Sequence, residues 1–269
     1  MRKYIRFFVF FLMLSLGLMG CSTAPKTGRS QLTLIPQSEL FSMSEQQYQQ
    51  FLQSHEKSDN EKDREMIKRV GWRIQKATEQ YFTEKGDSEI LQGYEWEFHL
   101  VKDEAANAWC MPGGRVVFYT GILPLTQNET GVATVMGHEI AHAVADHGNE
   151  RMSQQLLVGL GAFALNEALS EKPDETKKLF MGAYGLGSSV GVLLPYSREH
   201  ELEADYLGLI FMAKAGYNPE EAVEFWERMA ARQEQNPPEF LSTHPSNQQR
   251  IEKIKKHLPE AMKIYRASQ

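Results

Sequence analysis

The chain has 269 residues, of which 42% are hydrophobic and 24% charged, with a formal net charge of -6 at pH 7. This composition excludes an intrinsically disordered chain, because it supplies enough apolar surface for one large domain or two small ones with a core. The acidic balance argues against a polyanionic partner, so we expect no nucleic acid.

The first twenty residues have the layout of a secretory signal. Basic residues within 1–6 precede an apolar stretch from Phe7 to Leu14 that continues to Gly20. The sequence LMGC at residues 18–21 is similar to a bacterial lipobox, in which cleavage leaves Cys21 carrying lipid. We therefore expect residues 1–20 to be a lipoprotein signal peptide, with an uncleaved membrane anchor as the alternative.

The residue after the lipobox bears on localisation. Ser22 stands where many inner-membrane lipoproteins have Asp, so by analogy with bacterial sorting we expect an outer membrane lipoprotein facing the periplasm, the inner membrane being less favoured. Residues 21–36, which include Pro25, Gly28 and Pro36 among polar residues, are typical of a short tether. With Cys21 lipidated, Cys110 has no partner in the chain; we expect a small half-buried residue, with a regulatory thiol as the alternative.

The next segments predict two helices and two strands. Apolar residues recur at helical spacing over 37–53 and 60–81. Residues 94–101 alternate between apolar and polar, as a half-buried strand does. A turn at residues 111–114 separates this strand from a second, β-branched and aromatic one at residues 115–120.

The second half of the chain is predicted to be mostly helical. Asn128 is a candidate N-cap for a helix that runs to about Met152. Residues 156–194 are apolar and Gly-rich but interrupted by charges, which favours core or groove-lining helices, with superficial membrane contact as the alternative. Helices over 197–215, from Pro219 and from Ser246 complete a mostly helical α+β fold with a small sheet.

The sequence His138-Glu139-Ile140-Ala141-His142 lies in the helix that starts at Asn128. Two histidines four apart share a helix face and can bind one zinc ion, with Glu139 beside them. A catalytic zinc takes three protein ligands and keeps one position open, so a third ligand must come from elsewhere. The extended motif with a third histidine on the same segment is excluded, because Ala145 and Gly148 occupy its Gly and His positions.

The helix over 197–215 carries the candidates for the third ligand. Glu201 and Asp205 are four residues apart and share a face, whereas Glu203 points away from them. We therefore expect Glu201 to bind the metal and Asp205 to hold a ligating histidine by a hydrogen bond, with Glu203 as the less favoured ligand. One Zn²⁺ per chain is expected.

Three motifs in this order resemble those of one family: HExxH at 138–142, SRxxExxAD at 197–205, and STHP at 242–245 followed by Arg250. Together they resemble the zinc metallopeptidases typified by HtpX, the CaaX prenyl protease and mitochondrial Oma. With the lipobox and tether, the chain looks most like the bacterial periplasmic lipoprotein members such as LoiP and BepA. The resemblance implies a zincin-like (gluzincin) domain over 37–269.

The resemblance also implies roles for the residues at matching positions. His138, His142 and Glu201 would bind zinc, and Glu139 would act as general base and acid on water. His244 or Arg250 would donate to the oxyanion. In BepA-like relatives a matching histidine is implicated in occluding the zinc, so a fourth-ligand role for His244 stays open, as does a surface salt bridge for Arg250.

These observations together predict a membrane-anchored zinc metalloendopeptidase. We expect residues Arg115, Val116, Val117, Phe118 and Tyr119 to form an edge strand that pairs with an extended substrate. Unfolded or misassembled envelope proteins are the expected substrates, with partner proteases or assembly machinery as further partners. The alternatives are a non-catalytic chaperone lipoprotein and another zinc hydrolase such as a cell-wall amidase.

Overall fold

The computed structural model describes residues 21–23, 29–170, 172–188, 194–232, 237–245 and 248–269. The predicted signal peptide at residues 1–20 and the side chain of Cys21 lie outside this part. The chain divides into two compact units, the first comprising the described residues up to Leu40 together with Asp146–Ser197, and the second comprising Phe41–Ala145 and Arg198–Gln269. Each unit is described by itself.

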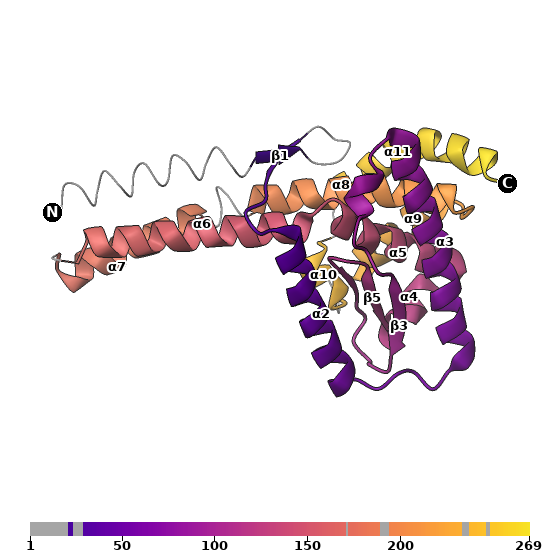
Figure 1. Ribbon diagram of the computed structural model, residues 1–269, viewed down its shortest axis with the longest axis horizontal. Helices are drawn as coiled ribbons and strands as arrows, with labels where there is room; N and C mark the ends of the chain where they lie inside the picture. The colour runs from indigo at the N-terminus through magenta and orange to yellow at the C-terminus, as the bar shows by residue number, and fades with distance from the viewer. Residues whose placement is uncertain (1–20, 24–28, 171, 189–193, 233–236, 246–247) are drawn as a thin grey trace. The chain divides into compact units, whose positions relative to one another are not determined.

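The described elements confirm a mostly helical fold with a small three-stranded sheet (Figure 1). In chain order they are β1 (Cys21–Thr23), β2 (Ser30–Leu32), α2 (Gln37–Ser54), α3 (Glu61–Lys85), η1 (Ser88–Leu91), β3 (Glu97–Val101), β4 (Ala108–Met111), β5 (Arg115–Tyr119), η2 (Thr120–Ile122), α4 (Leu123–Thr126), α5 (Glu129–Val144), α6 (His147–Ala168), α7 (Asp174–Ser188), α8 (Leu194–Lys214), α9 (Glu220–Arg232), α10 (Phe240–Thr243) and α11 (Gln248–Ala267).

The sheet of the second unit has the strand order β3-β5-β4. β5 pairs parallel with β3, Phe98 opposite Val116, and antiparallel with β4, Cys110 opposite Val116. All five residues of β5 are buried, as expected for a strand covered on both faces. The expectation that Arg115–Tyr119 is an edge strand is therefore wrong, because both sides of β5 are already paired. Strand β4, which was not predicted from the sequence, lies at one edge of the sheet.

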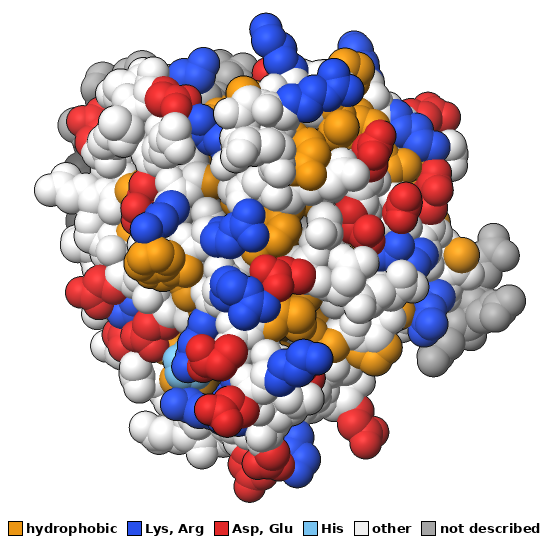
Figure 2. All heavy atoms as spheres, turned by 90° about the vertical axis from the view of Figure 1, so that its right-hand side faces the viewer, with side chains coloured by type: hydrophobic (Ala, Val, Ile, Leu, Met, Phe, Trp, Pro, Cys, Tyr) orange, Lys and Arg blue, Asp and Glu red, His pale blue; other side chains and the backbone are white. Residues whose placement is uncertain are grey.

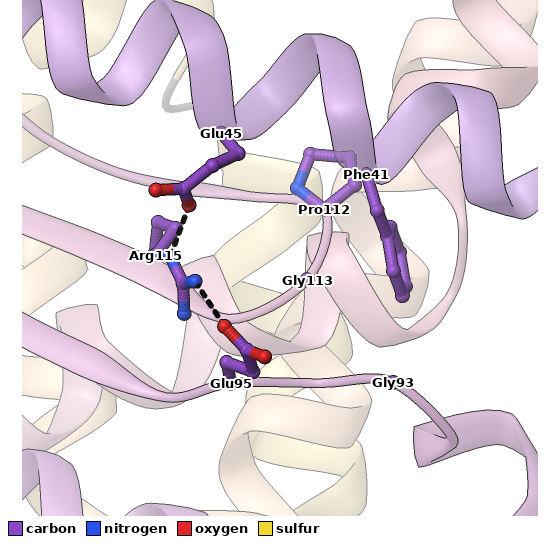
Figure 3. Close-up of a pocket in the computed structure, with 7 residues that line it drawn as sticks. All are labelled: Phe41, Glu45, Gly93, Glu95, Pro112, Gly113 and Arg115. Carbon is purple, nitrogen blue, oxygen red and sulfur yellow. Dashed lines mark hydrogen bonds and ion pairs between the residues drawn. The ribbon is translucent and has the colours of Figure 1, made fainter.

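Arg115 anchors the start of β5. Its guanidinium donates from Nε to Glu45 Oε2 of α2 at 2.8 Å and from Nη2 to Glu95 Oε2 at 2.7 Å (Figure 3). These pairs line a pocket of about 190 Å³ with Phe41 and the turn at Gly113. Because both glutamates reach solvent, the pairs fix the position of α2 over the sheet more than they stabilise the fold.

Helix α5 is the centre of the second unit. It begins at Asn128, whose side chain accepts from the Gly131 N–H as predicted, and it is buried on all sides from Gly131 to Val144. Helices α3, α4 and α9 and strand β4 all pack against it. A helix enclosed in this way holds its side chains in fixed directions.

The predicted long helix through the motif is two helices in the structure. α5 ends at Val144, and α6 begins at His147. Asp146 between them has a φ of 59°, in the left-handed region that ends helices. No Gly or Pro at this position signals the end of a helix, so the sequence predicted one continuous helix here.

The first unit contains α6 and α7, which lie side by side (Figure 1), and the strands β1 and β2. β2 packs against α6, so the segment predicted to be a tether is partly fixed. No helix among the described residues has both the length and the apolar composition needed to cross a bilayer.

Two glycines allow α5 and α8 to approach each other at backbone distance. A Cβ added to Gly137 would lie 2.8 Å from Gly208 O, and one added to Gly208 would lie 2.8 Å from His138 N. Neither contact can be relieved by rotating a side chain, because both involve backbone atoms. The crossing sets the separation of the helices that carry His138 and Glu201.

We expect Gly208→Ala to lower the free energy of unfolding by about 1–3 kcal/mol, because the added methyl forces the two backbones apart. Gly159→Ala is the matched control, since Gly159 lies inside α6 with nothing within 4 Å of its Cβ position. This control should be neutral or stabilising by up to about 1 kcal/mol. Urea unfolding measures both, and equal midpoints for Gly208→Ala and wild type would contradict the close crossing.

Candidate metal centre

α5 places two imidazoles and a carboxylate together in the interior. His138 and His142 follow each other on one face, their Nε2 atoms 3.1 Å apart and their rings at 80°. His138, Glu139 and His142 are at most 8% exposed. Neutral imidazole nitrogens that converge in this way are metal ligands in many proteins.

α8 supplies the next donor. Glu201 Oε2 lies 3.4 Å from His138 Nε2, and Glu201 Oε1 lies 3.4 Å from His142 Nε2. Burial opposes ionisation of Glu201, but the positive field of His142 and the hydrogen bonds of the histidines hold its pKa well below the usual range. Glu203 was expected to point away from Glu201 and Asp205. It is buried, and it lies outside the donor cluster.

His244, just after the short helix α10, completes the cluster. Its Nδ1 lies 3.1 Å from both carboxylate oxygens of Glu201 and 3.2 Å from His138 Nε2. The ring stacks on Phe240, with centroids 4.6 Å apart, which holds it in the cluster. The donor atoms of His138, His142, Glu201 and His244 all lie within 4.8 Å of one another.

The spacing of the donors fits zinc. Ligands at about 2.0–2.2 Å from a tetrahedral ion are roughly 3.3–3.5 Å from each other. Five contacts between donor atoms of the cluster measure 3.1 to 3.4 Å, and three nitrogens with one carboxylate oxygen are donors that zinc favours. His138, His142, Glu201 and His244 would therefore hold one Zn²⁺.

The charges of the surroundings also fit a divalent cation. Glu139, Glu201 and Asp205 are buried carboxylates, and Arg250 is the buried cation that contacts two of them. The excess of two negative charges is what one Zn²⁺ neutralises. Burial lowers the pKa of His138, yet hydrogen bonds that its ring donates to Asp205 and Glu201 raise it to about 9, so this site favours positive charge.

Asp205 and Arg250 fix the orientation of the donors by contacting His138 and Glu201 directly. Asp205 Oδ1 lies 3.0 Å from His138 Nδ1, as expected for a carboxylate that orients a ligating histidine. Arg250 donates to both oxygens of Asp205, at 2.8 and 2.7 Å, and lies 3.0 Å from Glu201 Oε2. Its guanidinium stacks on Trp226 at 3.8 Å. Although burial opposes ionisation of Asp205, Arg250 lowers its pKa.

Arg250 is not the surface salt bridge of the sequence-based alternative. It is 2% exposed, and its Nη1 also donates to Pro245 O at 3.0 Å. The guanidinium faces Asp205, Glu201 and the backbone. The STHP motif and Arg250 act together, because this backbone contact fixes the loop that carries His244.

Glu139 lies beside the cluster without belonging to it. Its Oε1 is 3.4 Å from His244 Nε2. Burial raises the pKa of Glu139, while the positive fields of His244 and His138 lower it. A carboxylate with a raised pKa is suited to accept and return a proton near neutral pH.

The edge strand β4 runs close to Glu139. Burial raises the pKa of the Cys110 thiol well above its usual value, and the charge of Glu139 adds to this effect. The N–H of Tyr119 donates to Asn107 O, and the alternation of an antiparallel pair therefore turns the backbone groups of Cys110 away from β5. The sequence signal that could have found this edge is the apolar stretch at 108–111, directly before the glycine turn.

Comparison with known proteins identifies the family. The model of "Peptidase family M48" matches residues 72–258. The mitochondrial metalloendopeptidase OMA1 of Saccharomyces cerevisiae is 39% identical over 200 residues, covering 68% of this chain and 52% of that protein. The human mitochondrial metalloendopeptidase OMA1 is 31% identical, covering 90% of this chain and 46% of that protein. The chain thus spans about half the length of these relatives.

A bacterial relative matches over a shorter range. The beta-barrel assembly-enhancing protease of Escherichia coli is 28% identical over 162 residues, covering 58% of this chain and 33% of that protein. The expected localisation, an outer membrane lipoprotein facing the periplasm, is contradicted by the relatives of greater identity and coverage, which are named as mitochondrial. The predicted family is confirmed, and the peptidase class predicted from the sequence agrees with that of the family. The chain belongs to peptidase family M48.

Proposed function

We propose that this chain is a zinc-dependent endopeptidase that cleaves misfolded or unassembled proteins while its N-terminal segment holds it at a membrane. The observation that carries the proposal is the buried set of four donor atoms on α5, α8 and the residue after α10, with Glu139 beside it. Membership in a peptidase family and the names of the relatives support it.

We assign zinc binding to His138, His142 and Glu201. Zinc bound there would lower the pKa of water and polarise a peptide carbonyl. Glu139 accepts a proton from water at its carboxylate and returns it to the leaving amine. Asp205 holds the Nδ1 side of His138, which keeps Nε2 turned toward the other donors.

The substrate would add as a strand to β4 in place of the strand expected from the sequence. Strand β4 packs against α5, the helix that carries Glu139, and the N–H and C=O of Cys110 face away from β5, so a peptide paired there would bring its carbonyl toward the donor cluster. Backbone pairing demands no particular side chain. Proteins with exposed, unpaired strands are therefore the substrates that this edge suits.

His244 gives the structure the features of a resting form. Its Nδ1 stands where a fourth ligand would, and its Nε2 points to Glu139. A histidine in this place takes the position that a catalytic zinc keeps open and also engages the general base. We propose that His244 leaves the donor cluster when the enzyme is active, in place of a role as oxyanion donor.

The metal and the proton acceptor can be separated by mutation. We expect His138→Ala to lose both zinc and peptidase activity, because one of the three ligands that remain in the active form is gone. Glu139→Gln should keep zinc and lose roughly 10²- to 10⁴-fold in kcat, because the general base is gone. Zinc quantitation and casein cleavage on the two variants measure this.

The same assays separate the alternative functions. Chelation should abolish cleavage, and added zinc should restore it. A Glu139→Gln protein that retains the full cellular effect of wild type would favour a chaperone. Cleavage of peptidoglycan but not of unfolded protein would favour an amidase.

Replacing His244 tests the resting form. We expect His244→Ala to raise casein cleavage while zinc stays bound, because the fourth position and Glu139 are both freed. His257→Ala, which removes a partly exposed histidine of α11, is the control and should leave the rate unchanged. A loss of activity in His244→Ala with zinc still bound would instead establish His244 as a donor to the reaction.

Substrate pairing with β4 would use the outward N–H of Cys110. Cys110→Pro removes this donor at an edge position where proline is tolerated, and Cys110→Ala keeps it. We expect Cys110→Pro to lower kcat/KM by about 2- to 10-fold relative to Cys110→Ala, the value of one hydrogen bond. Equal kcat/KM values for the two variants would place the substrate elsewhere.

A further inference from the structure

The large apolar side chains that are exposed gather on one pair of helices. Seven such side chains are exposed in the described part of the chain, and only Trp72 lies outside α6 and α7. The other six are Leu156, Leu157, Leu160, Phe163, Leu179 and Phe180. Phe163 is 69% exposed and Leu179 is 71% exposed, values that water-facing helices rarely show for such residues.

Helix α6 reverses the usual distribution of polar and apolar residues. Its buried residues are all polar and lie near its start, namely His147, Asn149, Glu150, Ser153 and Gln154. Its exposed large residues farther along are Leu and Phe. Residues 152–166 carry no charge and span about 22 Å of helix. This length is too short for a bilayer core of about 30 Å, but it suits a helix lying in the interface.

The two helices form one structural unit rather than two loose segments. They are joined by a short connection, and Tyr184 Oη of α7 donates to Val158 O of α6 at 3.0 Å. A Cβ added to Gly161 would lie 2.1 Å from Tyr184 Oη, so the glycine admits the ring. The charged residues gather at the connection, where Glu167, Lys172 and Asp174 flank it. We call α6 and α7 the apolar hairpin.

The N-terminal segment is bound to the base of the apolar hairpin. Arg29 donates from Nη1 and Nη2 to the two oxygens of Glu150, at 2.8 and 2.7 Å, and Glu150 is fully buried. The backbone N–H of Leu34 donates to Ser153 Oγ at 2.8 Å. Cys21 pairs with Leu32 in the β1–β2 ladder, and β2 packs against α6.

The chain before residue 21 contains the apolar stretch that begins at Phe7, which is the predicted membrane signal or anchor. A lipid surface is the partner that fits both the exposed apolar side chains of the hairpin and this N-terminal apolar stretch. By contrast, Figure 2 shows a face on which Lys and Arg side chains are interspersed with Asp and Glu, with apolar patches that are small. Such a face has the mixed charge of a surface in water.

We propose that the apolar hairpin lies in the boundary between headgroups and acyl chains of a lipid bilayer, beside the point where the N-terminal segment enters the membrane. Leu156, Leu160, Phe163, Leu179 and Phe180 enter the acyl region. The charged connection between the helices stays at the headgroups.

The test measures where the hairpin lies, using the full chain reconstituted in phosphatidylcholine vesicles with or without brominated acyl chains. Phe163→Trp and Phe180→Trp each add an indole to the apolar hairpin, and the difference from wild type isolates its emission. We expect this emission to be blue-shifted and to lose most of its intensity in brominated vesicles. Both positions are more than half exposed, so the variants do not disturb the packing.

Trp72 provides the matched control. It is 56% exposed on α3 of the other unit, and the difference between wild type and Trp72→Phe isolates its emission, which bromine should not quench. Because the N-terminal segment is present in every variant, the readout reports the depth of the hairpin rather than attachment of the chain. Added emission that bromine leaves unchanged would overturn the proposal. A blue shift that follows protein concentration without lipid would overturn it in favour of a second copy.

Discussion

The close crossing of α5 and α8 is the constraint on which the site depends. Gly137 and Gly208 face each other with no Cβ between them, and Gly208 also abuts the backbone of His138. A helix pair with ordinary residues at the crossing keeps its axes about 8–10 Å apart, which small residues shorten. The glycines therefore bring Glu201 and Asp205 of one helix within contact of His138 on the other.

Burying this many charges would be costly without a network that satisfies them. Arg250 contacts both Asp205 and Glu201, and its planar guanidinium stacks on Trp226. A buried carboxylate without a partner loses several kcal/mol of solvation, so each member of the network depends on the others. Arg250 thus acts on the metal site through the residues it holds.

Local periodicity made part of the site readable from the sequence. The spacing of His138 and His142, the pairing of Glu201 with Asp205, and the cap at Asn128 all follow from one turn of helix, and the structure brings these residues together as expected. Strand order is different, because it depends on partners distant in the chain. β5 was taken for an edge although β4 covers it, and the polar burial of Glu203 had no local signal. Compartment was misjudged from a short terminal motif.

The ligand set has a mechanical consequence that comes from chain connectivity. His244 is 106 residues from His138 and 43 residues from Glu201. An ion bound by all three residues would cross-link the chain and close the loops between them. Such a cross-link lowers the conformational entropy of the unfolded chain and so favours the folded state. Release of His244 would open only the loop that ends at His244, while His138, His142 and Glu201 would still join α5 to α8.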